Sequence, residues 1–130
     1  MKIFLTGATG YIGKRLLIQL LEEGHRVVCS VRDKKRLSLK LYQNHLDKIE
    51  IIENDFLDKN TLANIPKDID FAYYLVHSMS SNDGDFLEKE RISAQNFRKV
   101  LENTSVKQVV FLTGIINEEK LSKHLQSRKN

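Results

Sequence analysis

Three glycines spaced three residues apart, Gly7, Gly10 and Gly13, are the residues whose pattern points to chemistry. They follow the apolar stretch "KIFL" and open "YIGKRLLIQLLEEG", where hydrophobic residues recur at helical spacing. At such a strand–helix junction Gly7 would turn the chain, Gly10 would leave room for an anion, and Gly13 would let the helix lie close to the sheet. Unpaired amides and the dipole at the helix start favour a phosphate group. The motif therefore predicts a dinucleotide site, and a glycine turn without a ligand is the alternative.

Strand-like and helix-like stretches alternate along the whole chain. The expected strands are residues 2–5, 26–31, 49–54, 69–76 and 107–113, and helical or irregular crossovers separate them. This alternation predicts an α/β fold with a doubly wound parallel sheet of the Rossmann type. Right-handed crossovers give the strand order 3-2-1-4-5. We expect one dinucleotide-binding domain over residues 1–130 and no separate substrate domain.

Composition excludes several other classes of protein. The 130 residues carry a net charge of +4, and their basic residues form no stripe interleaved with aromatic side chains, so we expect no nucleic-acid partner. No apolar run reaches the length of about 20 residues that a membrane helix needs. Cys29 is the only cysteine, so neither an internal disulfide nor a thiolate metal cluster is expected, and a cytoplasmic location fits best.

The sequence resembles the extended and atypical branches of the short-chain dehydrogenase/reductase superfamily. The stretches that carry the resemblance are, in chain order, "TGATGYIG", "VR", "NDFLD", "YYLVHSM", "ERISAQNFRKVL", "VVFLT" and "HLQSR". They are most similar to NAD(P)-binding, nucleoside-diphosphate-sugar-epimerase-like members. The resemblance implies a protein related to NADP-dependent oxidoreductases and epimerases, of which this chain resembles only the N-terminal part. It also implies cofactor contacts along the first turn and helix, at Gly7, Thr9, Gly10, Tyr11, Ile12 and Gly13.

The residues after the second strand bear on the choice between NADP(H) and NAD(H). In the family pattern an acid that accepts from the ribose would fall on Val31, and Arg32 follows it. A guanidinium binds a 2′-phosphate with two hydrogen bonds, whereas a carboxylate repels it. We therefore expect NADP(H) to be favoured over NAD(H), with Arg32 as the main contact and Arg36 as a helper. The alternative makes Asp33 the ribose-binding acid and turns Arg32 toward solvent.

Two further stretches match cofactor-binding positions of the family. Asp55 and Phe56 match the position that brackets the adenine, and Asp55 would also serve as a helix cap. The residues Leu75, Val76 and His77 match the stretch beneath the nicotinamide ribose, and His77 would equally serve as a cap. Asn96, in the long helix, matches a family asparagine that we interpret as structural.

The usual catalytic set of the superfamily is not visible. Such enzymes use a tyrosine and a lysine in a YxxxK helix, but all four tyrosines here precede the fifth strand and none has a lysine four residues later. The weak candidates are Thr113 and, at i, i+4 spacing, His124 and Arg128, whose alternative is a solvated helix end. Two functions stay open: a cofactor-binding part of an enzyme, and a non-catalytic dinucleotide-binding redox sensor or interaction module. The fifth strand would be an exposed edge, which predicts a homodimer through it.

Overall fold

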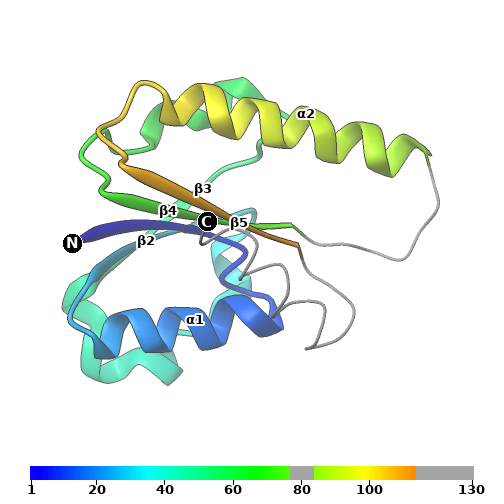
Figure 1. Cartoon of the computed structure of the whole chain (residues 1–130). Coiled ribbons are helices and arrows are strands. Elements are labelled where there is room, and N and C mark those ends of the chain that lie inside the picture. Colours follow the sequence, from blue (N-terminus) through cyan, green and yellow to red (C-terminus); the bar gives the residue numbers. More distant parts are fainter. Residues whose placement is uncertain (77–83, 114–130) are drawn as a thin grey trace.

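The computed structural model describes residues 1–76 and 84–113, which form a central sheet with helices on both faces (Figure 1). The strands are β1 (Lys2–Thr6), β2 (Arg26–Val31), β3 (Ile49–Glu53), β4 (Phe71–Val76) and β5 (Gln108–Thr113). Every pairing is parallel, and the strand order is β3-β2-β1-β4-β5. The structure thus confirms the predicted doubly wound sheet.

The first two crossovers lie on one face of the sheet, and the last two lie on the other. Helix α1 (Tyr11–Glu22) and the 3-10 segments η1 (Lys34–Arg36) and η2 (Leu39–Lys48) form the β1–β2 and β2–β3 crossovers. The segment η3 (Lys59–Asn64) and helix α2 (Gly84–Leu101) follow β3 and β4. In Figure 1, α1 lies on one side of the sheet and α2 on the other. The chain therefore reverses its winding direction between β1 and β4, which are adjacent strands.

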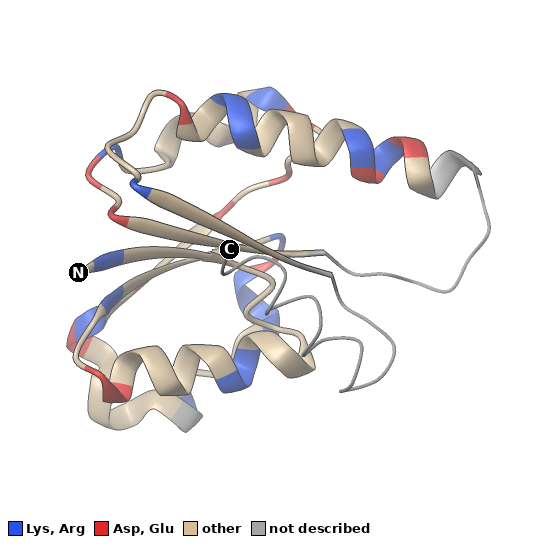
Figure 2. Ribbon diagram, in the orientation of Figure 1, with Lys and Arg blue, Asp and Glu red and all other residues tan. Residues whose placement is uncertain are grey.

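The sheet separates two hydrophobic cores. Successive side chains of a strand point to opposite faces, so Ile3 and Leu5 pack on the α1 side while Phe4 packs on the α2 side. The α1-side core also holds Leu17, Leu21, Val27, Cys29 and Tyr42, and the α2-side core also holds Val28, Ile69, Tyr74, Phe97 and Leu101. Figure 2 shows the charged residues on the helices, the loops and the ends of strands, outside these cores.

The boundaries differ from the expected ones in small ways that have physical causes. Strand β4 begins at Phe71 rather than at Ile69, which is fully buried just before the strand. Leu87 has the helical spacing of half-buried Ala94 and buried Leu101, which predicts burial, but it is 63% exposed. Figure 1 shows the reason, because the first turns of α2 extend past the ends of the strands. Leu87 belongs to the first turn of this helix.

The sheet has one edge at β3 and the other at β5, within the described part of the chain. Strand β3 contains only exposed and half-buried residues, as expected of an edge. Strand β5 pairs with β4 along its whole length, from Gln108 to Thr113. The predicted pairing of two chains through β5 stays a prediction. Neither of the two described α-helices combines the length and the apolar character of a membrane span.

Candidate functional site

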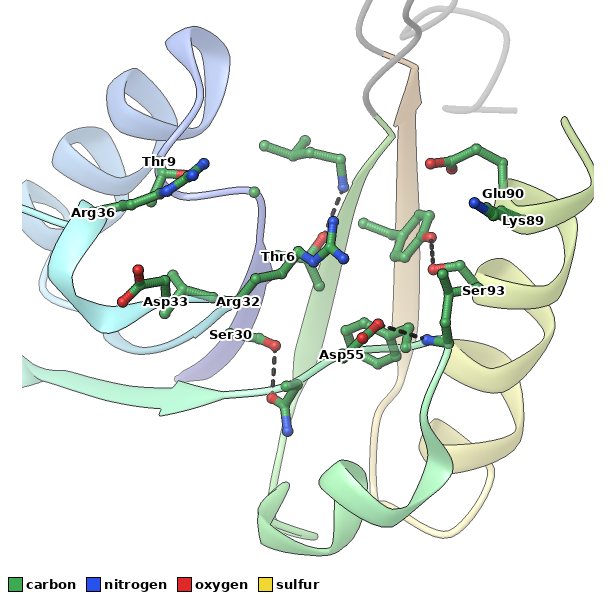
Figure 3. A pocket seen from close by; sticks show the side chains of 17 residues that line it. Thr6, Thr9, Ser30, Arg32, Asp33, Arg36, Asp55, Lys89, Glu90 and Ser93 are labelled. Carbon is green, nitrogen blue, oxygen red and sulfur yellow. Dashed lines mark hydrogen bonds between the residues drawn. The ribbon is translucent and has the colours of Figure 1, made fainter. Parts of the chain in front are cut away.

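A cavity of about 620 Å³ lies at the carboxyl ends of the strands, where the winding reverses between β1 and β4. Ligands of doubly wound sheets bind at this position, and the volume suits a small-molecule site. Its lining comes from β1, β2, β4, α2 and the loops that follow β1, β2 and β3. The lining residues are Thr6, Gly7, Thr9, Ser30, Val31, Arg32, Asp33, Arg36, Asn54, Asp55, Phe56, Leu57, Tyr74, Leu75, Lys89, Glu90 and Ser93 (Figure 3).

The turn between β1 and α1 is tightly packed at two of its glycines. Gly7 has a φ of +76°, and a Cβ there would lie 2.8 Å from the Cβ of Leu75. A Cβ at Gly13 would lie 1.9 Å from the carbonyl oxygen of Gly7. Gly13 therefore permits close packing of α1 on the turn itself, which corrects the expectation that it packs on the sheet. Both positions need glycine because backbone, or a side chain fixed in β4, occupies the space.

The amino end of α1 is open to an anion. Gly10 is the N-cap residue and has extended backbone angles, and its amide donates to the Gly7 carbonyl at 3.0 Å. No side chain caps the helix, and its first turn contains no acidic residue. The amides of the first turn and the positive end of the helix dipole are thus left for an external acceptor. Thr9, beside them, lines the cavity.

Thr6 holds the sheet together where β1 leaves it. The pairing of β1 with β4 runs as far as Leu5 opposite Tyr73. Beyond that point, the hydroxyl of Thr6 accepts a hydrogen bond from the Leu75 amide at 3.0 Å. The side chain thus replaces a backbone acceptor of β1, and β4 keeps its place while the chain turns toward Gly7.

The basic wall of the cavity follows β2. Arg32 and Arg36 both line the cavity, and Figure 3 shows them on the same side as Thr9. Asp33 lies between them in the sequence and caps η1, because its Oδ1 accepts from the Lys35 amide at 3.0 Å. One carboxylate oxygen of Asp33 is therefore engaged in local structure. The two arginines bring two positive charges to the rim that also carries the glycine turn.

The loop after β3 forms the floor of the cavity. The Asp55 carboxylate accepts from the Leu57 amide at 2.9 Å, which makes a tight turn, while Asp58 caps η3 by accepting from the Asn60 amide. The Phe56 ring packs edge-on against Tyr74, with 6.3 Å between the ring centroids. The carbonyl of Phe56 accepts from the side-chain amide of buried Asn96 at 2.6 Å. Asn96 ties α2 to this loop, in agreement with a structural role.

The opposite wall comes from α2 and contains residues that the sequence motifs do not indicate. Lys89, Glu90 and Ser93 line the cavity there, and the hydroxyl of Tyr74 shares a hydrogen bond of 2.8 Å with that of Ser93. Burial raises the pKa of Tyr74, while the Ser93 hydrogen bond lowers it and Glu90 raises it. Tyr74 is therefore protonated at neutral pH. These residues belong to separate elements, and only the packing of α2 over β4 brings them together.

A buried polar cluster supports the floor, and only its member Asn54 lies in one of the quoted stretches, "NDFLD". The hydroxyl of Ser30 donates to the side-chain oxygen of Asn54 at 2.6 Å. The side-chain amide of Asn54 donates to the Thr61 carbonyl at 2.8 Å and to Asn64 Oδ1 at 2.7 Å. Asn54 is 4% exposed, so its amide group is satisfied within the protein. The cluster joins β2, the end of β3 and η3.

The structure brings together seven of the predicted binding residues. These are Gly7, Thr9, Arg32, Arg36, Asp55, Phe56 and Leu75, all in the cavity lining. Gly10, Tyr11, Ile12 and Gly13 lie in the turn and the first turn of α1, outside the lining. Tyr11 is 70% exposed and lies beneath the Arg15 guanidinium, 4.4 Å from its ring centroid. Their contacts with a cofactor stay predictions.

The remaining candidates lie at or beyond the limits of the described residues. Val76 and Thr113 are the last residues of β4 and β5 and lie opposite each other in the register. His77, His124 and Arg128 lie outside the described residues. The three catalytic candidates therefore stay predictions.

Comparison with known proteins identifies the family. A family described as NAD(P)H-binding matches residues 7–130. The chain belongs to this family. Cinnamoyl-CoA reductase 1 of Petunia hybrida is 25% identical over 116 residues, which are 87% of this chain and 35% of that protein. An uncharacterized protein of Schizosaccharomyces pombe is 54% identical over 35 residues, 27% of this chain and 12% of that protein.

Solved structures show the same fold. Gre2 of Candida albicans, in complex with NADPH, has a TM-score of 0.71 at 21% identity, and the match covers 85% of this chain and 36% of that protein. Vestitone reductase of alfalfa has a TM-score of 0.65 at 18% identity, over 85% of this chain and 35% of that protein. The family match thus confirms the predicted relationship to NAD(P)-binding proteins, and these structures confirm the fold. The chain spans about a third or less of the length of these relatives.

Proposed function

We propose that this chain binds NADP(H) in preference to NAD(H), as the cofactor-binding part of an NADP-dependent reductase. The observation that carries the proposal is the position of Arg32 and Arg36 on the rim of the cavity that contains the glycine turn. The pyrophosphate would lie at the open amino end of α1, and the 2′-phosphate would lie between the two guanidinium groups. Structural relatives bound to NADPH, such as Gre2, support the proposal.

The interactions of Asp33 bear on which of the two cofactors, NADP(H) or NAD(H), the chain prefers. If Asp33 accepted from the ribose hydroxyls, its carboxylate would favour NAD(H) and repel a 2′-phosphate. Its Oδ1 instead caps η1, and the neighbouring side chains at the rim are cationic. A phosphate bound by an arginine gains charge-assisted hydrogen bonds of about 1.5 to 3 kcal/mol. This favours NADP(H) by at least tenfold, or about 1.4 kcal/mol.

Calorimetric titration of the purified chain with NADPH, NADP, NADH and NAD tests this proposal. We expect the phosphorylated pair to bind at least about tenfold more tightly. The variants Arg32→Gln and Arg36→Gln should reduce this preference. Arg26→Gln is the matched control, because Arg26 is an exposed arginine at the amino end of β2, away from the cavity lining. If none of the four dinucleotides binds, or if NADH binds as tightly as NADPH, the proposed preference is wrong.

In the proposed reductase, the bound nicotinamide would supply hydride transfer and the residues of this chain would bind and orient the cofactor. Turnover of a carbonyl or sugar-nucleotide substrate by the purified chain would support an enzymatic function. A partner protein captured only with one redox form of the dinucleotide would support the non-catalytic alternative.

A further inference from the structure

The acidic residue at the end of the edge strand β3 makes one contact that the cofactor motifs do not account for. Glu53 is exposed and does not line the cavity, yet its Oε2 accepts a hydrogen bond from the Lys34 amide at 3.0 Å. Lys34 is the first residue of η1, the short turn that carries Arg36. Glu53 also lies opposite Val31 in the register of β2 and β3. A carboxylate from another strand is thus bound to the start of the basic turn.

The basic turn, η1 (Lys34–Arg36), is held by three residues, Glu53, Asp33 and Leu37. Glu53 accepts from the Lys34 amide, and Asp33 accepts from the Lys35 amide with its side chain and from the Arg36 amide with its carbonyl, at 3.1 Å for the latter. At the other end, Leu37 is buried in the α1-side core at 6% exposure. These contacts satisfy the amides at the start of the turn. The backbone of Arg36 is therefore fixed although its side chain is exposed.

We propose that Glu53 is a positioning residue for dinucleotide selectivity. By accepting from the Lys34 amide, it holds Arg36 on the rim of the cavity that Arg32 also lines, where the 2′-phosphate of NADP(H) would bind. This inference rests on the proposed function. A positioning role and a purely electrostatic role of Glu53 predict opposite effects on NADPH binding. If only charge mattered, removal of a carboxylate near a phosphate site would tighten phosphate binding. Loss of the cap instead loosens the turn and weakens NADPH binding.

The test compares Glu53→Ala, Glu53→Gln and Glu50→Ala with the wild-type chain. Glu50 is an exposed glutamate of the same strand whose side chain makes no hydrogen bond or ion pair with the residues that the structure describes, so Glu50→Ala controls for the loss of a glutamate from β3. Glutamine keeps an oxygen that accepts from the Lys34 amide but has no charge. Dissociation constants for NADPH and NADH are measured by calorimetry, well below the unfolding temperature of each variant.

We expect Glu53→Ala to weaken NADPH binding about fivefold while NADH binding changes by less than about twofold. Glu53→Gln and Glu50→Ala should stay within about twofold of the wild type for both ligands. An unchanged NADPH-to-NADH ratio in Glu53→Ala overturns the positioning role. Tighter NADPH binding by both Glu53 variants also overturns it, because it would show an effect of charge alone.

The wild-type titration separates the two proposals. If the wild type prefers NADPH and Glu53→Ala keeps the same preference, only the positioning role is wrong. If the wild type binds neither ligand, or both equally, the proposed function is wrong and the positioning role is wrong with it.

Discussion

The contact between Gly13 and the β1–α1 turn predicts that Gly13→Ala damages both the fold and the cofactor site. The added Cβ would lie 1.9 Å from the Gly7 carbonyl oxygen, and contacts below 3.0 Å essentially do not occur, so the turn or the helix must retreat by about 1.1 Å. The neighbouring atoms are backbone and cannot rotate away, unlike a flexible side chain. The substitution therefore separates the helix start from the turn that would hold the pyrophosphate.

The magnitude follows from two opposed terms. Alanine is favoured over glycine inside a helix by about 1 kcal/mol, whereas overpacking costs about 1 to 3 kcal/mol and more against rigid backbone. We expect a net loss of about 2 kcal/mol of unfolding free energy, or a fall of about 7 °C in the melting temperature for a chain of this length. NADPH binding should weaken at least about tenfold, because the phosphate site is displaced.

Thermal unfolding and calorimetric titration of the same preparations measure both effects. The matched control is Gly24→Ala, because Gly24 has a φ of +90° at the end of α1 and no atom within 4 Å of an added Cβ. This control should lose about 1 kcal/mol through backbone strain and keep its NADPH affinity. An unchanged or higher melting temperature for Gly13→Ala, with unchanged NADPH affinity, would refute the reasoning.

Three further predictions concern the core and the sheet edge. The hydroxyl of Tyr42 is buried without a hydrogen-bond partner among the described residues. Tyr42→Phe should therefore leave the unfolding free energy, measured by urea denaturation, unchanged or raise it by up to about 1 kcal/mol. A clear decrease would reveal a partner for the hydroxyl. Burial raises the pKa of Cys29 to about 12 from 9.0, so the thiol ionises first in the unfolded chain. Its contribution to stability is complete below pH 9 and is lost as the pH rises to about 12, and Cys29→Ala should flatten this part of the urea stability profile; an identical profile would contradict the assignment. The open edge of β5 predicts a dimer in sedimentation at micromolar concentration, and a monomer there would argue against pairing through β5.

The sequence predicts the strand order because the apolar stretches alternate with crossovers. Right-handed crossovers in a doubly wound sheet then give the order 3-2-1-4-5. Strand β2 is predicted to the residue, since all but its first residue are buried and the apolar run "RVVCSV" coincides with the strand. The glycine turn is equally readable, because its spacing reflects packing within one short segment. Local signals of this kind are present in the sequence itself.

Other features depend on contacts between distant segments and leave no such signal. Tyr74 and Ser93 meet only because α2 packs over β4, and Glu53 reaches the Lys34 amide only because β2 and β3 are in register. For Leu87 the sequence pattern is present but misleading. Its helical spacing predicts burial, yet the side chain is exposed, because the first turns of α2 extend past the ends of the strands. The helical pattern gives the face of the helix but not the length of the surface beneath it.

The position of the cavity has a consequence for how the two layers of the domain open. The lining includes the turn on the α1 side, at Gly7 and Thr9, and residues of the α2 side, at Phe56 and Tyr74. The sheet separates the two cores, so the helices on either face can undergo local fluctuations independently. A ligand in contact with both walls would lose contacts whenever either layer opened. Occupancy of the cavity would thus couple the two layers into one cooperative unit.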